Sequence, residues 1–219
     1  MIKISTLRQL SFLLLAGVML SGCQSTYYKA MEQVGFHKRD IMVDRIEDTQ
    51  KSQEEAQEQF QSALDQFRSV VAFDGGDLEF IYNRLNDEYE SSYSAAEKVR
   101  ERINGVRDVS DALFDEWEDE LSLYSSSSLR AESSRKLKDT RRRYDQMMAS
   151  MVKAEKRMQP VLDALHDQVL YLKHNLNARA ITALKGEFSS IKSDIDKLLQ
   201  EMQTSIRESQ AFINTLKKQ

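Results

Sequence analysis

The sequence predicts an all-α protein: an elongated antiparallel bundle of about four long helices with coiled-coil-like packing. Three observations lead to this prediction. The 219 residues include one proline and seven glycines, and so few helix-breaking residues are typical of a chain that is helical almost throughout. Four long stretches carry apolar or small residues at alternating spacings of three and four, the pattern of helices packed in a bundle. Three short segments rich in glycine, serine or asparagine separate these stretches and predict turns.

Residues 1–22 are predicted to be a secretory signal peptide. Lys3 and Arg8 give it a positive start, and the apolar run over residues 12–20 is too short to span a bilayer. The run ends in Leu20-Ser21-Gly22-Cys23, which resembles the lipobox of bacterial lipoproteins. Alternative interpretations are a plain secretory leader with a chance cysteine, or a buried N-terminal helix.

The lipobox resemblance implies cleavage between Gly22 and Cys23 and acylation of Cys23, the only cysteine in the chain. Two or more acyl chains would anchor the protein stably in a membrane. In the lipoproteins that this leader resembles, an aspartate after the cysteine favours retention in the inner membrane. Gln24 at that position therefore implies a lipid anchor in the outer membrane, with the body of the protein in the periplasm.

Residues 23–38 are predicted to form the lipidated segment and a short helix close to the membrane. Tyr27, Tyr28 and Phe36 fit two environments equally well. They could lie at the level of the lipid headgroups, where amphipathic rings are favoured, or they could pack on the bundle. Residues 39–219 are predicted to be the helical bundle itself.

The first long helix is predicted from about Arg39 to Phe73. The residues in the middle of this helix are polar or small, so this section should pack weakly or lie against a polar neighbour. Asp74-Gly75-Gly76-Asp77 predicts the turn that follows, with Gly75 in the left-handed conformation that ends a helix and Asp77 capping the next one. The heptad positions of this helix are Met42, Ile46, Thr49, Gln53, Ala56, Phe60, Ala63, Phe67 and Val70.

The second helix carries the clearest heptad pattern, from Leu78 to Trp117. Gly105 lies beside the pattern and costs about 1 kcal/mol inside a helix, so a bend near Asn104 is compatible with the sequence. Ser125 to Ser128 predict the turn to the third helix, because serine hydrogen-bonds locally and caps helices. The heptad positions are Leu78, Tyr82, Leu85, Tyr89, Ser92, Ala96, Val99, Ile103, Val106, Ser110, Leu113 and Trp117.

The third helix contains Pro160, for which we expect a kink rather than a break because no capping residue precedes it. Asn175-Leu176-Asn177 predicts the last turn. Four methionines of this helix could form a soft binding surface, but their helical spacing favours the core: Met147, Met148, Met151 and Met158. The pattern of the fourth helix is Ile181, Leu184, Phe188, Ile191, Ile195, Leu198, Met202, Ile206, Phe212 and Leu216.

Two charged runs flank the serine turn, the acidic residues 115–120 and the basic residues 135–143. One interpretation is an anion-binding patch for lipid headgroups or another envelope polymer, made of Arg135, Lys136, Lys138, Arg141, Arg142 and Arg143. The favoured interpretation is that the runs face each other along the hairpin and fix its register. It places Asp119 beside Arg135 and Glu116 beside Lys138.

The composition excludes some functions. The formal charge of −4 becomes −6 once Lys3 and Arg8 leave with the leader, and a mildly acidic body argues against nucleic acid as a partner. No nucleophile has a nearby base and no glycine-rich phosphate loop is present, so no catalytic residue, cofactor or small-molecule substrate is predicted. No metal site is predicted either, because the histidines lack a histidine partner at helical spacing: His37, His166 and His174.

Four segments of the chain resemble an uncharacterised family of helical proteobacterial proteins known only as a domain of unknown function. They are residues 38–45, 73–78, 112–117 and 172–180. The resemblance implies an all-helical fold and no assigned activity. The resulting expectation is a non-enzymatic scaffold or adaptor whose partners are the membrane and either envelope proteins or further copies of itself. The alternative is a periplasmic binding module, such as a holdase chaperone or a lipid carrier.

Overall fold

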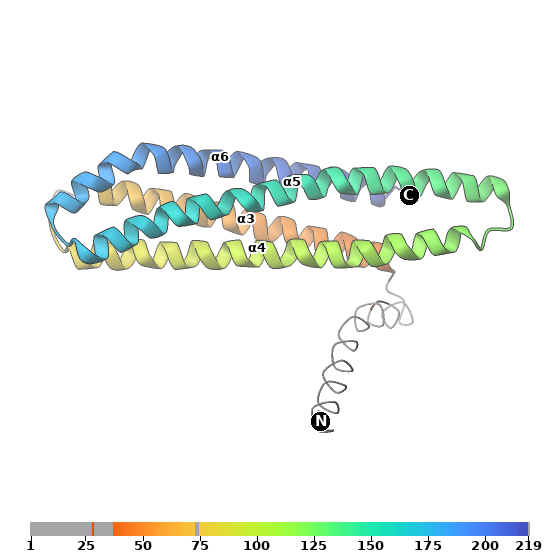
Figure 1. The fold of residues 1–219 in the computed structure, drawn as a ribbon, viewed down its shortest axis with the longest axis horizontal. Helices are drawn as coiled ribbons and strands as arrows, with labels where there is room; N and C mark the ends of the chain where they lie inside the picture. Colours follow the sequence, from red (N-terminus) through yellow and green to blue (C-terminus); the bar gives the residue numbers. More distant parts are fainter. Residues whose placement is uncertain (1–27, 29–36, 73–74, 219) are drawn as a thin grey trace, which may run out of the picture.

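A computed structural model of the chain describes residue 28 and residues 37–72 and 75–218. The described residues form four long helices, with no strand among them, that run antiparallel to their neighbours in an elongated bundle (Figure 1). The helices contain 34 to 48 residues, which corresponds to lengths of roughly 50 to 70 Å. The predicted fold class is confirmed. The helices are α3 (Lys38–Val71), α4 (Leu78–Leu121), α5 (Ser127–His174) and α6 (Ala178–Leu216).

The three turns lie where the sequence predicts them, and each following helix has a side-chain cap. Asp77 Oδ1 accepts the backbone N–H of Glu79 at 2.9 Å. Ser126 Oγ accepts that of Leu129 at 3.3 Å, and Asn177 Oδ1 accepts that of Arg179 at 3.0 Å. These caps satisfy backbone donors that the first turn of a helix leaves without a partner.

The end of α3 differs from the prediction. Ala72 caps the helix in the right-handed region, with φ −84° and ψ −3°. Gly75 and Gly76 have φ values of 155° and 134°, far from the left-handed helical value of about +57°. The prediction that Gly75 ends the helix in the left-handed conformation is therefore wrong. The two glycines instead give the turn a positive-φ backbone that side chains disfavour.

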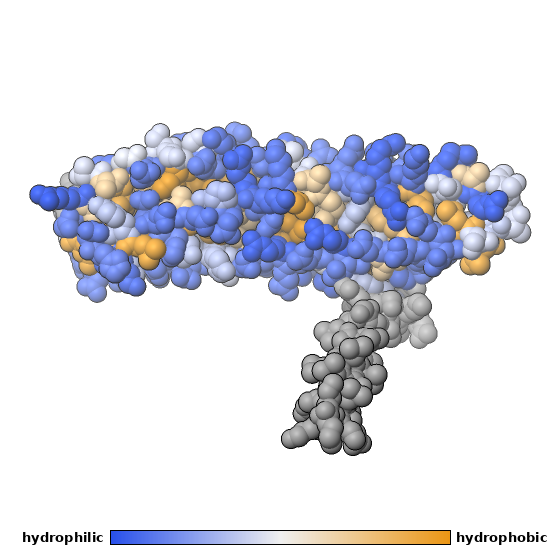
Figure 2. All heavy atoms as spheres, in the orientation of Figure 1, coloured by the Kyte–Doolittle hydropathy of each residue, from blue (hydrophilic) through white to orange (hydrophobic). Residues whose placement is uncertain are grey.

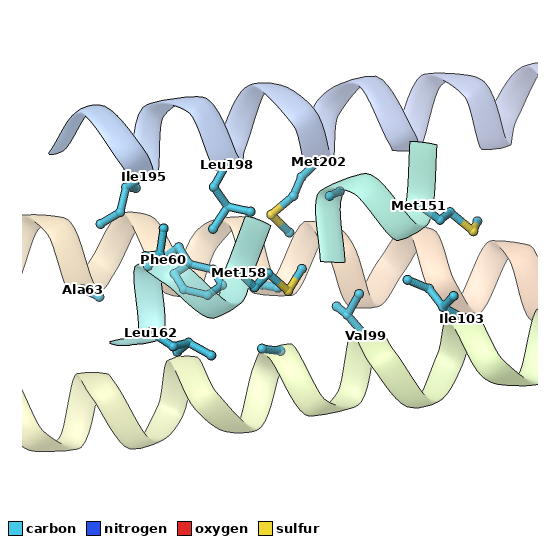
Figure 3. Close-up of a cluster of buried hydrophobic side chains, with 14 of the residues drawn as sticks. Phe60, Ala63, Val99, Ile103, Met151, Met158, Leu162, Ile195, Leu198 and Met202 are labelled. Carbon is cyan, nitrogen blue, oxygen red and sulfur yellow. The ribbon is translucent and has the colours of Figure 1, made fainter. Parts of the chain in front are cut away.

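Each helix packs against its neighbours in the sequence, and α3 closes the bundle by packing against α6. The heptad positions of α3 are all buried. In the middle of the bundle, side chains from all four helices meet, among them Phe60, Val99, Met158 and Met202 (Figure 3). The four methionines of α5 are buried, so their assignment to the core is confirmed. Pro160 lies inside an unbroken α5, as expected.

The polar middle of α3 lies against a polar part of α6. The Gln53 amide donates to Ser205 Oγ at 2.9 Å and accepts from it at 3.2 Å, with both side chains fully buried. Gln50 and Gln57 donate to backbone carbonyls of α6, each at 3.0 Å. Of the two expectations for this section, packing against a polar neighbour is the one that the structure confirms.

The α4–α5 hairpin projects beyond the ends of α3 and α6 at one end of the rod (Figure 1). Leu216, near the end of α6, lines the same small hollow as Trp117 of α4 and Lys136 of α5. Beyond that level no other described helix lies beside the hairpin (Figure 1), and we call residues 121–132 the hairpin tip. Hydrophilic side chains dominate the face of the rod shown in Figure 2, with smaller apolar areas between them.

Candidate interaction site at the α4–α5 hairpin

One ion pair joins the acidic run of α4 to the basic run of α5. Arg141 Nη1 lies 2.7 Å from Glu118 Oε1, and the Arg141 guanidinium carbon lies 5.0 Å from the centre of the Phe114 ring. Both charged side chains are about half exposed, so the pair stabilises the fold by only about 0–1 kcal/mol. It does fix the position of α4 relative to α5.

The two ion pairs that the sequence predicts across the hairpin are wrong. Glu116 Oε1 lies 2.9 Å from Nζ of Lys38, whose side chain is only 5% exposed, so Glu116 faces α3. In the described part of the chain, Asp119 and Arg135 form no ion pair. The physical reason is that successive residues of a helix point about 100° apart. The acidic run therefore winds around α4, and Glu118 is the member that meets α5.

The structure divides the six basic residues of the predicted anion patch. Lys138, Arg141 and Arg142 line a surface groove of about 740 Å³, together with Leu121 of α4 and Ala149 of α5.

Lys136 lies instead in the small hollow beside Leu216, of about 220 Å³, and pairs with Glu132 at 3.2 Å. Arg135 and Arg143 line neither of these hollows. Within the described residues, Arg135, Lys138 and Arg143 form no ion pair.

Four aspartates form an acidic ridge along α4: Asp108, Asp111, Asp115 and Asp119. Their spacing of three and four residues places them on one side of the helix, and as far as the structure describes the chain none of them has a cationic partner within ion-pair distance. The pKa of Asp111 is raised, chiefly by burial and then by the negative charges of Asp115 and Asp108. Asp108 and Asp111 were not among the predicted site residues, although their helical spacing from Asp115 was a usable signal.

Two features are absent from the described residues. Nowhere among them do three His, Cys, Asp or Glu side chains come together to hold a metal ion. None of their helices is long and apolar enough to cross a membrane. The predicted cleavage site at Gly22 and lipidation site at Cys23 lie outside the described residues.

Of the predicted membrane-proximal segment, residues 23–38, the structure describes Tyr28, His37 and Lys38. It is 4% exposed and belongs to the hydrophobic core. For Tyr28, packing on the bundle is therefore the correct alternative. Tyr27 and Phe36 lie outside the described residues.

A family model described as "Protein of unknown function (DUF2959)" matches residues 27–216. The chain belongs to this family. The match confirms the resemblance to a domain of unknown function and covers the whole four-helix bundle. The DUF2959 match begins after Cys23, so the predicted lipobox is not part of it. Neither the curated proteins nor the solved structures contain a match to the chain.

Proposed function

We propose that the protein is a lipid-anchored scaffold or adaptor of the bacterial envelope, held in the outer membrane with its helical body in the periplasm. The observation that carries this proposal is Leu20-Ser21-Gly22-Cys23 at the end of an apolar leader. Signal peptidases need small residues before the cut, and Ser21 and Gly22 supply them. The lipid would be attached to Cys23 only a short distance before α3 begins at Lys38.

The shape of the body supports a scaffold rather than an enzyme. Helices of roughly 50 to 70 Å make a rod that can hold partners away from the membrane. The largest hollow described above is an open groove on the surface, whereas side chains from all four helices fill the middle of the bundle (Figure 3). The alternative function, a holdase or lipid carrier, would need helices that separate to expose apolar surface. The filled core favours the scaffold.

The test of the anchor is the variant Cys23→Ala in the full-length protein. We expect palmitate to label the wild type and the matched control Ser25→Ala but not Cys23→Ala. The variant should also keep its leader and run as a larger precursor on a gel. Fractionation should place the wild type with the outer membrane, and Gln24→Asp should move it to the inner membrane. An unlabelled wild type that fractionates like Cys23→Ala would refute the proposed anchor.

A further inference from the structure

Two ridges of opposite charge lie beside each other on the outside of the α4–α5 hairpin. The first is the acidic ridge of α4. The second is a basic ridge on α5, formed by Arg135, Lys138 and Arg142, whose spacing of three and four residues places them on one side of that helix. All the side chains of both ridges are exposed. A groove of about 740 Å³ borders the basic ridge at Lys138 and Arg142, and on α4 it is lined by Glu118 and Leu121. We call the two ridges and this groove the charged face.

The two ridges match each other in height along the rod. The ring centres of Phe114 and Tyr144 lie 5.3 Å apart, and this contact sets the register of the antiparallel helices together with the ion pair between Glu118 and Arg141. Counting five residues along both helices from the contact between Phe114 and Tyr144 places Asp119 level with residue 139, one residue from Lys138. It also places Asp115 level with residue 143, one residue from Arg142.

We infer that the charged face binds a second copy of this chain around a two-fold axis parallel to the rod, with both hairpin tips at the same end. Rotation about such an axis places the acidic ridge of each copy on the basic ridge of the other. Rotation about an axis perpendicular to the rod would instead place acid on acid and base on base, which is repulsive. The charges thus select a parallel pair over an antiparallel one.

A second copy fits this face better than an anionic membrane does. A membrane surface carries one sign of charge, so it would repel the acidic ridge as strongly as it attracts the basic one. Asp115 and Asp119 form no ion pair within the described part of their own chain. The second copy would bring its Arg142 near Asp115 and its Lys138 near Asp119. Lys138 would gain its first ion pair among the described residues, whereas Arg142 also pairs with Asp139 of its own chain at 3.0 Å.

The size of the face predicts a weak association. The groove extends from Ser134 to Ala149, about 22 Å along the helix, and two helices of about 10 Å width give roughly 450 Å² per copy. The total of roughly 900 Å² lies at the lower limit for specific interfaces. We therefore expect a salt-sensitive dimer. The dimer does not depend on the membrane anchor, although anchoring in one membrane would raise its effective concentration.

The test uses full-length copies with two different tags, co-expressed and then captured through one tag in mild detergent at low salt. Wild-type copies should be captured together. Lys138→Glu/Arg142→Glu and Asp115→Lys/Asp119→Lys should each lose self-capture at least tenfold, because like charges then face each other in both contacts. Captured with one another, the two variants should pair as well as the wild type does, because every contact again joins opposite charges.

A matched control is Lys173→Glu/Lys185→Glu, the same change of charge at exposed positions towards the other end of the rod. This control should pair as the wild type does. Circular dichroism of each variant checks that the helices are intact. Absence of wild-type pairing, or failure of the two reversed variants to rescue each other while both are folded, would overturn the inference.

Cross-linking tests the parallel arrangement. Ser134 and Ala149 are exposed and line opposite ends of the groove. In a parallel dimer, Ser134→Cys and Ala149→Cys should each cross-link to themselves through a bismaleimide, at levels well above the wild type with its native Cys23. An antiparallel dimer would cross-link the two variants only to each other and would contradict the inference.

Vesicles that contain anionic phospholipid test the alternative partner. If wild-type copies fail to pair but bind these vesicles, and Lys138→Glu/Arg142→Glu abolishes the binding, the face contacts a membrane instead of a second copy. Neither result depends on acylation of Cys23.

Discussion

The four-helix body and the two-helix hairpin tip are built from the same helices but differ in what surrounds them. In the body, α4 and α5 each lie between two neighbours, and their heptad side chains meet those of α3 and α6. In the tip, no other described helix lies beside α4 and α5 (Figure 1). Leu123 and Leu129 are 79% and 55% exposed there, whereas Phe60 in the body is fully buried.

This difference separates stability from binding. Burial of apolar area stabilises a fold by about 25 cal/mol per Å², so the free energy of folding is concentrated in the body. The tip and the charged face beside it contain exposed charges that contribute little to folding and remain available to a partner. Substitutions in the two regions should therefore change different measurements.

The largest expected effect is the contrast between Phe60→Ala and Leu129→Ala. Phe60 is fully buried among all four helices, so its removal should cost about 3–5 kcal/mol of unfolding free energy. Leu129 is mostly exposed, and its removal should cost less than about 0.5 kcal/mol. Urea denaturation of the two variants measures both values. Equal costs would mean that the tip is covered in solution and that the contrast with the body is wrong.

The contrast between body and tip shows how much the sequence could predict. A heptad pattern encodes which side of a helix is buried, so the seam positions of α3, from Met42 to Val70, were predictable and all are buried. Capping residues encode the turns, and Asp77 caps α4 where the sequence placed it. These signals are local, which is why the fold class and the helix bounds followed from the sequence.

Contacts between helices depend on information that is not local. The acidic run contains several carboxylates that could pair with several cations, and the cations of α3 compete with those of α5 for them. Lys38, which lies 78 residues before Glu116 in the chain, takes the carboxylate that was assigned to Lys138. Arg100 is a similar case. It lies outside the heptad pattern, yet its Nε donates to Glu155 of α5 at 2.8 Å.

An intermediate loss of unfolding free energy is expected at the buried polar contact between α3 and α6. Gln53→Ala should cost about 1–3 kcal/mol, because it leaves the buried Ser205 hydroxyl without its side-chain partner. Gln53→Leu combined with Ser205→Ala should be nearly neutral, since both polar groups are then removed together. Thermal unfolding of the single and double variants gives the coupling between the two positions. Costs that simply add would show that the buried hydrogen bonds contribute no coupling.

The smallest expected effect concerns the acidic ridge, where burial and the charges of Asp115 and Asp108 raise the pKa of Asp111. A carboxyl group with a raised pKa in the folded state binds protons more tightly there than in the unfolded chain. Its ionised form therefore destabilises the fold at neutral pH, and this penalty disappears as the pH falls below 3.8, the ordinary pKa of an aspartate.

Asp111→Asn should accordingly stabilise the isolated chain at pH 7 by a few tenths of a kcal/mol, the size of a repulsion between like charges one helical turn apart. At about pH 3, where the carboxyl group is protonated in both states, the variant and the wild type should have the same free energy of unfolding.

The control is Asp167→Asn, at an exposed position of α5 with no ion pair among the described residues. It should have no measurable effect on the free energy of unfolding at either pH. Denaturant titrations of all three proteins at high dilution, where any dimer is dissociated, make the comparison. A stabilisation that persists at low pH would mean that the ridge is not under electrostatic strain in the monomer. The acidic ridge would then have no need of the cations that a second copy supplies.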